Sequence, residues 1–315
     1  MTRTGPRVSV VIPTTGRREM LHRTLLSLAR QTYPADRFEV VVVDEGSIDG
    51  TQAMVAALAL PYRLRYVRRT PRGAAAAWNA GVRAAAADLV IFLDGPTAVG
   101  RDFVAAHAAA HGRPRRVVQG PVIPVAALEK SPDAAPGLWD LVRARFGPGN
   151  MSVARMHVEE AGMFDEEVRD GAWAGLELLD RLQAMGLTVV KVSQAWGWLW
   201  LPPLSAADLD LLRERARRRG RAGIAYFRRQ PTWRVRSRLG LFPPVFWLDR
   251  LLFPRDWPDA AGFRRWAARA EARRPRLVRF LVRLALHHAY VEGLREGLHG
   301  LGEGRPEARQ VQREL

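Results

Sequence analysis

Single carboxylates follow two short apolar runs in the first hundred residues of this chain. Residues 40–43 (VVVV) lead directly into Asp44, and residues 89–93 (LVIFL) lead into Asp94. Both runs have the length and composition of buried strands, so each would deliver its carboxylate to the end of a strand. There it can hold a metal ion or a sugar nucleotide, or it can cap a turn or a helix. No second carboxylate stands beside Asp94, because glycine and Pro96 come next.

The elements that would position these carboxylates alternate between strand and helix. Residues 8–12 (VSVVI) form a third β-branched run, and the alternating residues 63–67 (RLRYV) predict an edge strand. Helices are expected at residues 18–31, which carry leucines at helical spacing, and in the alanine-rich residues 74–87. Repeated strand–helix–strand units predict a mostly parallel sheet, and such sheets bind ligands at the carboxyl ends of their strands.

The connecting segments carry weaker signals. Residues 46–51 (GSIDGT) are expected to open a helix, with Ser47 or Asp49 as its N-cap. Residues 117–153 are rich in glycine and proline and are predicted to be irregular. An amphipathic helix is expected around Leu178.

Most of the net positive charge lies in the C-terminal third, because the acidic residues are fewer there. Residues 201–315 hold 25 basic and 12 acidic residues, whereas residues 1–200 hold 24 and 20. We therefore expect two regions, a first domain of residues 1–203 and an arginine-rich helical region of residues 204–315. Such a positive field attracts the phosphates of lipids, nucleic acids or sugar nucleotides.

Six ordered segments within residues 7–200 resemble the family 2 glycosyltransferases, the GT-A-fold enzymes that transfer a sugar from a nucleotide sugar with inversion. These segments are VSVVIPTTGR, LLSLARQTYP, VVVDEGSIDGT, RGAAAAWNAGVRAAAADLVIFLD, GNMSVARMHVEEAGMFDE and ELLDRLQAMG. The resemblance implies an α/β GT-A fold with a mostly parallel sheet. It also implies sugar transfer in cell-envelope or exopolysaccharide synthesis.

The resemblance assigns a role to each matching polar residue. The implied nucleotide-sugar ligands are Pro13, Thr14, Asp44, Ser47, Arg72, Asn79 and Asp94. Asp44 would accept an N–H from the nucleotide base, and Asp94 would lie near the ribose and the diphosphate. Without the resemblance, Asn79 would be assigned to the surface of an alanine-rich helix.

The chain departs from the family pattern in the motifs that carry the chemistry. The family's Asp-x-Asp metal motif reads Asp94-Gly95-Pro96 here. The family's Glu-Asp pair, which supplies the general base, falls on Ala174-Gly175. Mg²⁺ or Mn²⁺ binding by Asp94 is therefore expected to be weak or absent, because a hard cation needs several oxygen ligands.

Two replacements and one alternative follow from these departures. Glu177 is the candidate general base, although it has the spacing of a helical ion pair with Arg181. Arginine can take over the charge of a metal, because guanidinium groups bind diphosphate in a bidentate manner. The alternative function is a catalytically inactive relative that binds a nucleotide, a glycan or a partner enzyme.

The expected partners are a nucleotide-sugar donor, a glycan or lipid-linked acceptor, and an anionic membrane surface. Residues 276–286 (RLVRFLVRLAL) place arginines on one side of a helix, which is typical of interfacial helices. A helix packed on the first domain is the alternative, and nucleic acid is disfavoured because no recognised motif is present. No spanning run or signal peptide is recognised, so a cytoplasmic location, peripheral at the inner face of the membrane, is expected.

Overall fold

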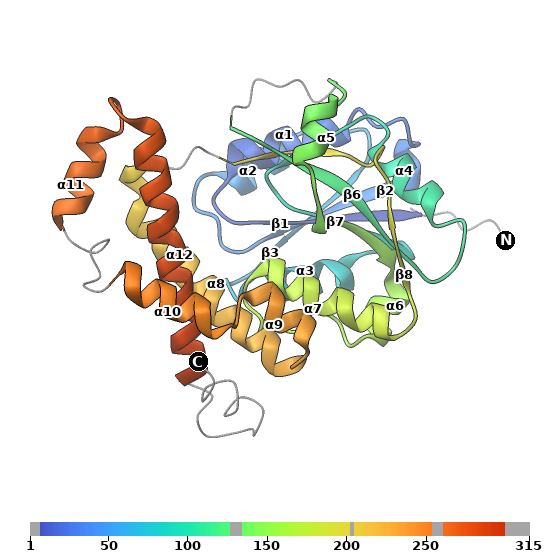
Figure 1. Ribbon diagram of the computed structural model, residues 1–315. Coiled ribbons are helices and arrows are strands. Elements are labelled where there is room, and N and C mark those ends of the chain that lie inside the picture. The colour runs from blue at the N-terminus through green and yellow to red at the C-terminus, as the bar shows by residue number, and fades with distance from the viewer. Residues whose placement is uncertain (1–6, 127–133, 202–204, 254–260, 300–315) are drawn as a thin grey trace. The chain divides into compact units, whose positions relative to one another are not determined.

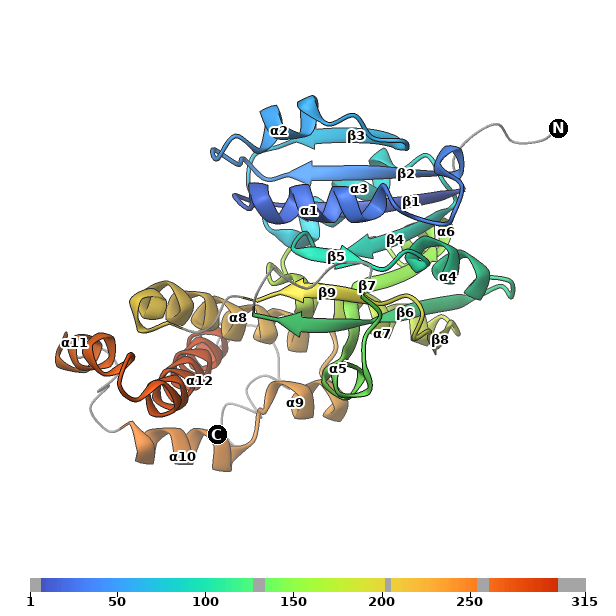
Figure 2. The ribbon, with the colours of Figure 1, turned by 90° about the horizontal axis from the view of Figure 1, so that it is seen from above.

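Short apolar runs in the first two hundred residues form one nine-stranded sheet (Figures 1 and 2). The computed structural model describes residues 7–126, 134–201, 205–253 and 261–299, and the chain divides into two compact units, Met1–Pro202 and Pro203–Leu315. The strand order is β3-β2-β1-β4-β7-β6-β9-β5, and β8 pairs with β6. The strands are β1 (Val8–Thr14), β2 (Phe38–Asp44), β3 (Arg63–Arg68), β4 (Leu89–Leu93), β5 (Thr97–Val99), β6 (Arg116–Val125), β7 (Arg145–Ala154), β8 (Thr188–Lys191) and β9 (Gly197–Trp200).

The strands β3, β2, β1 and β4 run parallel to one another. β1, β2 and β4 are buried on both faces, whereas the edge strand β3 is partly exposed. In β1, Val10 and Ile12 belong to the apolar cluster that includes helix α1. Val11 points to the other face, where a Cβ on Gly81 would lie 2.1 Å from its side chain. Burial on both faces explains why β1, β2 and β4 are mainly apolar, whereas the edge strand β3 mixes apolar residues with arginines. Five of the eight described strand pairs are parallel, so the predicted α/β class with a mostly parallel sheet is confirmed.

Helices cover both faces of this sheet (Figure 1). The helices α1, α2 and α4 lie on one face, and α3, α6 and α7 lie on the other. On the second face, Trp78 packs with its ring centroid 5.1 Å from that of Phe92 and 6.0 Å from that of Phe164. The helices of this unit are α1 (Arg18–Leu28), α2 (Thr51–Ala57), α3 (Ala74–Ala84), α4 (Phe103–Ala110), α5 (Leu138–Arg143), α6 (Arg155–Glu160) and α7 (Gly171–Ala184), with a 3₁₀ turn at Ala35–Arg37.

The segment predicted to be irregular, residues 117–153, contains most of two long strands, so that prediction was wrong. β6 and β7 pair antiparallel, with a register shift between Gln119 and Pro121. Proline lacks a backbone donor and is tolerated in a sheet where the ladder is interrupted. The glycine and prolines of β6 hid the strand because they break the β-branched pattern without ending the strand.

The second unit is helical in its described part, as predicted. Its elements are a 3₁₀ turn at Ala206–Asp208, α8 (Leu209–Arg229), α9 (Trp233–Leu239), α10 (Pro243–Leu252), α11 (Ala261–Ala270) and α12 (Pro275–His299). α8 and α12 approach closely because each helix has a glycine facing the backbone of the other. A Cβ on Gly220 would lie 2.2 Å from the Tyr290 carbonyl oxygen, and a Cβ on Gly293 would lie 2.0 Å from the Arg217 carbonyl oxygen. Within this unit α12 lies between α8 and α10 (Figure 2). No helix of the described residues is long and apolar enough to cross a membrane.

Candidate functional site

Four adjacent parallel strands end along one edge of the sheet. Thr14 pairs with Asp44, and Asp44 pairs with Arg68. Asp94 directly follows β4, the other neighbour of β1. The register therefore places the two predicted carboxylates at the same edge, where open α/β sheets bind their ligands.

Asp44 is fully buried and is held by two neighbours. Its Oδ1 accepts hydrogen bonds from the Ser47 backbone N–H at 2.9 Å and from Ser47 Oγ at 2.6 Å. Its Oδ2 accepts a hydrogen bond from the Tyr66 hydroxyl. Burial, together with this hydrogen bond, raises the pKa of Tyr66, so the phenol stays a donor. Because a carboxylate offers about four acceptor positions, Asp44 retains capacity for one ligand N–H.

Side chains of the β2–α2 loop fix the backbone around this edge. Ser47 Oγ also accepts a hydrogen bond from the Gly16 N–H at 2.8 Å. Glu45 is buried, and its Oε1 accepts the backbone N–H groups of Arg72 and Gly73, both at 3.0 Å. The three loops that follow β1, β2 and β3 are thereby tied together, and the Arg72 side chain is exposed.

The N-cap of α2 differs from the prediction. Gly50 occupies that position with a left-handed backbone, so neither Ser47 nor Asp49 is the cap. Asp49 still accepts a hydrogen bond from the Thr51 N–H at 3.2 Å and another from the Arg18 N–H at 2.9 Å. It therefore links the start of α2 to the start of α1.

Asn79 is buried within α3 and is not a surface residue. Its Nδ2 donates to Phe164 O and to Glu166 Oε1, both at 2.9 Å, and its Oδ1 accepts the Phe164 N–H at 2.9 Å. These bonds hold the loop before α7 against α3. The structure thus shows a bracing function for this side chain, and its predicted contact with a nucleotide stays a prediction.

Asp94 lies half-buried against β7. Its backbone N–H donates to Gly149 O at 2.9 Å, and a Cβ on Gly149 would lie 2.2 Å from Asp94 Oδ2. Burial raises the pKa of Asp94 to about 6, with Arg17 opposing the shift and Asp170 adding to it. One cation and a second carboxylate therefore share the electrostatic environment of Asp94.

Asp170 is a site residue that was not found from the sequence. It is the N-cap of α7, and its Oδ1 accepts the Ala172 and Trp173 N–H groups at 3.1 Å. A Cβ on Gly171 would lie 3.0 Å from the Ala74 side chain, so the start of α7 packs on the start of α3. The pattern Asp-Gly before a helix is a capping signal, but nothing in it points to Asp94.

The position of the family's general base is filled by another side chain. A Cβ on Gly175 would lie 2.1 Å from Pro148 Cβ, so residue 175 has no room for an acid. Glu177 is buried, and Arg181 donates to its Oε1 at 2.7 Å and to its Oε2 at 2.5 Å. The ion pair that was the alternative for Glu177 is observed, and its role as a general base stays a prediction.

The described residues do not fit a metal held by the protein alone. No cluster of three or more possible metal-binding side chains is found among them. His107 and His111 have metal-pair spacing, yet His107 contacts Ser152 and Asn150 and His111 contacts Ser152. A hard divalent cation needs more oxygens than Asp94 supplies.

The sequence and the solved structures of other proteins place this unit in a known family. Residues 9–136 match glycosyl transferase family 2. The matched residues, which make up most of the first unit, are similar in sequence to this family. The chain is also 29% identical over 306 residues to validoxylamine A glucosyltransferases from two Streptomyces hygroscopicus subspecies, jinggangensis (strain 5008) and limoneus. The match covers 84% of this chain and 69% and 64% of those enzymes.

Solved structures give the fold of the family 2 unit as GT-A. The mannosyltransferase PcManGT from Pyrobaculum calidifontis, in complex with GDP-Man and Mn²⁺, matches with a TM-score of 0.62 at 20% identity, over 94% of this chain and 88% of that one. Residues 1–349 of S. aureus TarS, in complex with UDP-GlcNAc, match with a TM-score of 0.50 at 17% identity, over 93% and 92% of the two chains. The predicted family and fold are confirmed.

Proposed function

We propose that the chain transfers a sugar from a nucleotide-sugar donor bound where β1 to β4 end. The observation that carries this proposal is Asp44, a buried carboxylate whose orientation is fixed by Ser47 and Tyr66 and which keeps capacity for one more N–H donor. Pro13 and Thr14, which pair with Val43 and Asp44 on the neighbouring strand, are proposed to contact the same nucleotide. Structural neighbours that bind GDP-Man and UDP-GlcNAc support a donor of this class.

The chemistry at the diphosphate is proposed for Arg17 and Asp94. Arg17 lies within electrostatic range of Asp94, and its guanidinium can neutralise charge that develops on the leaving diphosphate. Asp94 with a raised pKa can hold a proton near pH 6 and donate it to a ribose or phosphate oxygen. A Mg²⁺ or Mn²⁺ ion brought in by the donor would have Asp94 as a protein ligand, and we expect its binding to be weak.

The general base is proposed to be Asp170 and not Glu177. Asp170 Oδ1 caps α7, and among the described residues no hydrogen bond involves its Oδ2. The side chain is half-buried and lies within electrostatic range of Asp94. A carboxylate in this place can accept the proton of a sugar hydroxyl during transfer.

The acceptor is proposed to be a glycan or a lipid-linked glycan of cell-envelope or exopolysaccharide synthesis. Validoxylamine A, the acceptor in the name of the two relatives, belongs in the same test panel. The second candidate function is a catalytically inactive relative that binds a nucleotide, a glycan or a partner enzyme. The Pro148 side chain packed on Gly175, together with Pro96 in the metal motif, favours this candidate.

Calorimetric titration with UDP, GDP and dTDP, with and without Mn²⁺, tests donor binding, and hydrolysis of the matching nucleotide sugars tests turnover. Asp44→Asn should weaken nucleotide binding about tenfold or more, because a carboxylate acceptor is lost. Asp88→Asn, at the opposite end of β4 from Asp94, is the matched control and should leave binding unchanged. Absence of binding by all three nucleotides would exclude the transferase. Binding without turnover of any donor would establish the inactive relative.

Asp170→Asn separates the two roles of that residue. Asparagine keeps an oxygen for the helix cap but cannot accept a proton, so stability should change little while kcat falls about a hundredfold or more. An unchanged kcat would exclude Asp170 as the base.

A further inference from the structure

The helix α10 in the second unit has its apolar side facing outwards. Trp247, Leu248, Leu251 and Leu252 are 67%, 49%, 59% and 48% exposed, and the two prolines at the start of the helix are also exposed. These residues recur at helical spacing and cover about half of the helix surface. Within that half no side chain is polar, which is the reverse of an ordinary surface helix.

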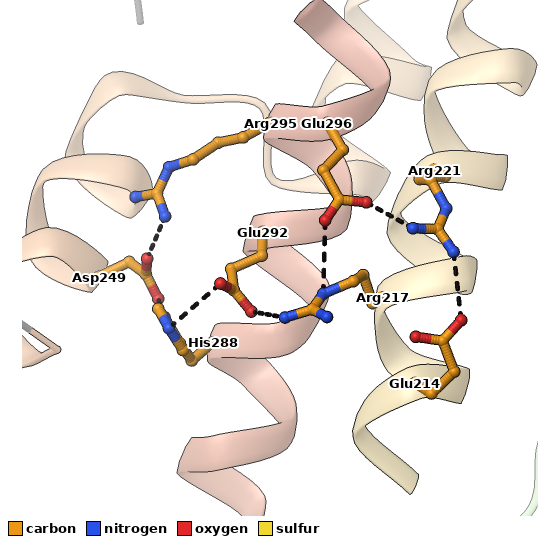
Figure 3. A network of polar contacts seen from close by, with 8 residues as sticks. All are labelled: Glu214, Arg217, Arg221, Asp249, His288, Glu292, Arg295 and Glu296. Atoms are coloured by element: carbon orange, nitrogen blue, oxygen red, sulfur yellow. Dashed lines mark hydrogen bonds and ion pairs between the residues drawn. The ribbon is translucent and has the colours of Figure 1, made fainter. Parts of the chain in front are cut away.

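Polar contacts with α12 fix this orientation (Figure 3). Asp249, the one acidic residue of α10, is fully buried, with its Oδ1 3.0 Å from His288 Nδ1 and its Oδ2 2.8 Å from Arg295 Nη1. Arg295 also donates to Phe246 O at 3.2 Å. Rotating α10 to bury its leucines would break the contacts of Asp249 with His288 and Arg295, which is unfavourable because Asp249 and His288 are both buried. The outward position of Trp247 is therefore built into the fold of this unit.

An aromatic cluster extends the apolar face from α10 to α9. Trp233 is 70% exposed, and its ring centroid lies 5.1 Å from that of Phe242, the N-cap of α10. The Arg236 guanidinium lies 6.0 Å from the Trp233 ring centroid and 5.8 Å from that of Phe242. The resulting surface, which we call the α9–α10 face, consists of Trp233, Pro243, Pro244, Trp247, Leu248, Leu251 and Leu252.

The charges that helices α9 and α10 themselves expose are positive. Helices α9 and α10 carry four arginines, and Asp249, their one carboxylate, points inwards. Other carboxylates of the unit are engaged elsewhere: Glu292 and Glu296 of α12 pair with Arg217 and Arg221 of α8 (Figure 3). Arg250 is exposed beside the leucines, and within residues 205–253 and 261–299 it has no carboxylate partner.

We propose that the α9–α10 face docks on an anionic phospholipid bilayer. Trp233 and Trp247 would lie at the headgroup level, and the leucines would enter the acyl boundary. Arg250 at the edge would meet lipid phosphates, which matches its positive charge and the absence of a carboxylate partner within residues 205–253 and 261–299. A protein partner would need carboxylates around an apolar core, whereas a bilayer provides an apolar layer under a sheet of phosphates. Docking of this kind requires no sugar transfer by the first unit.

Sedimentation of the full chain with vesicles tests this surface. At low salt the chain should bind vesicles of equimolar phosphatidylcholine and phosphatidylglycerol and should bind phosphatidylcholine alone far more weakly. For the double variant Trp247→Ala/Leu251→Ala, the partition coefficient onto the anionic vesicles should fall about tenfold or more, because two apolar side chains no longer enter the bilayer. Trp139→Ala is the matched control: Trp139 is 75% exposed on α5 in the other unit, and its removal should leave binding unchanged.

Arg250→Gln tests the electrostatic part separately. Binding to the anionic vesicles should fall about fivefold, the effect of one arginine near a charged surface, and weak binding to neutral vesicles should not change. All substituted side chains are exposed, so the unfolding temperature should stay within the error of the wild type. Equal binding of the double variant and the wild type, or equal loss with Trp139→Ala, would overturn the assignment. So would a wild type that binds no vesicles but forms a dimer abolished by the double variant, because a second copy would then cover the face.

Discussion

Replacing Asp94 by asparagine should change how the stability of the chain depends on pH. Burial raises the pKa of this carboxyl from 3.8 to about 6, and each pKa unit corresponds to about 1.4 kcal/mol. The folded chain therefore holds a proton up to about pH 6, whereas the unfolded chain releases it near pH 4. The free energy of unfolding contributed by Asp94 falls as pH rises between these values, by at most about 3 kcal/mol. Asparagine has nearly the same shape and no such penalty, so the variant should be the more stable protein at pH 7.5.

The assay is urea unfolding of wild type and Asp94→Asn at several pH values between 4.5 and 7.5. Buried His107 and His111 have pKa values lowered to about 4 by desolvation, so their contribution to stability grows as pH rises from about 4 to 6.5. That trend opposes the trend of Asp94 but is present in both proteins, and it cancels in their difference. Asp88→Asn, an exposed position at the opposite end of β4, is the matched control for the Asp-to-Asn replacement itself.

The predicted result is a stability difference in favour of the variant that is about 1 kcal/mol at pH 4.5 and approaches its maximum of about 3 kcal/mol by about pH 6.5. A difference that stays flat would show that Asp94 is not desolvated. A difference of the opposite sign would show that attraction by Arg17 outweighs burial, and the proposed proton on Asp94 near pH 6 would then be excluded.

Three further substitutions test the packing described above. Gly175→Ala should destabilise the chain by about 1–3 kcal/mol in urea unfolding because its Cβ meets Pro148, and Pro148→Gly in the same chain should recover part of the loss. Asn79→Ala should cost about 2–4 kcal/mol, because a buried amide with three hydrogen bonds is removed, and should speed limited proteolysis before α7; unchanged cleavage would contradict the bracing role. Gly293→Ala should lower the unfolding temperature, whereas Gly262→Ala, with no heavy atom within 4 Å of the new Cβ, should leave it unchanged or raise it.

The strands that were predicted from the sequence are those whose own residues form a recognisable apolar run. β1, β2 and β4 are buried on both faces, so their apolar runs are unbroken, and their order along the chain places Asp44 and Asp94 at one edge. β6 and β7 were missed because their glycines and prolines break the pattern, although they are tolerated where the ladder is interrupted.

The parts of the candidate site that were missed depend on contacts between distant segments. Tyr66 is separated from Asp44 by 22 residues, and Asp170 is separated from Asp94 by a longer stretch that includes the three strands β5, β6 and β7. No local spacing links the members of either pair. The contact of Glu177, in contrast, could be predicted locally. Its i,i+4 spacing to Arg181 is that of a helical ion pair, and this ion pair is observed.

The bonds from Glu45 to the Arg72 and Gly73 backbone, and from Gly16 to Ser47, have a thermodynamic consequence. The loops around Asp44 are ordered before any ligand arrives, so little conformational entropy is lost when one enters. Amide hydrogen exchange in these loops should already be slow in the free protein and should slow only slightly further when a nucleotide is added.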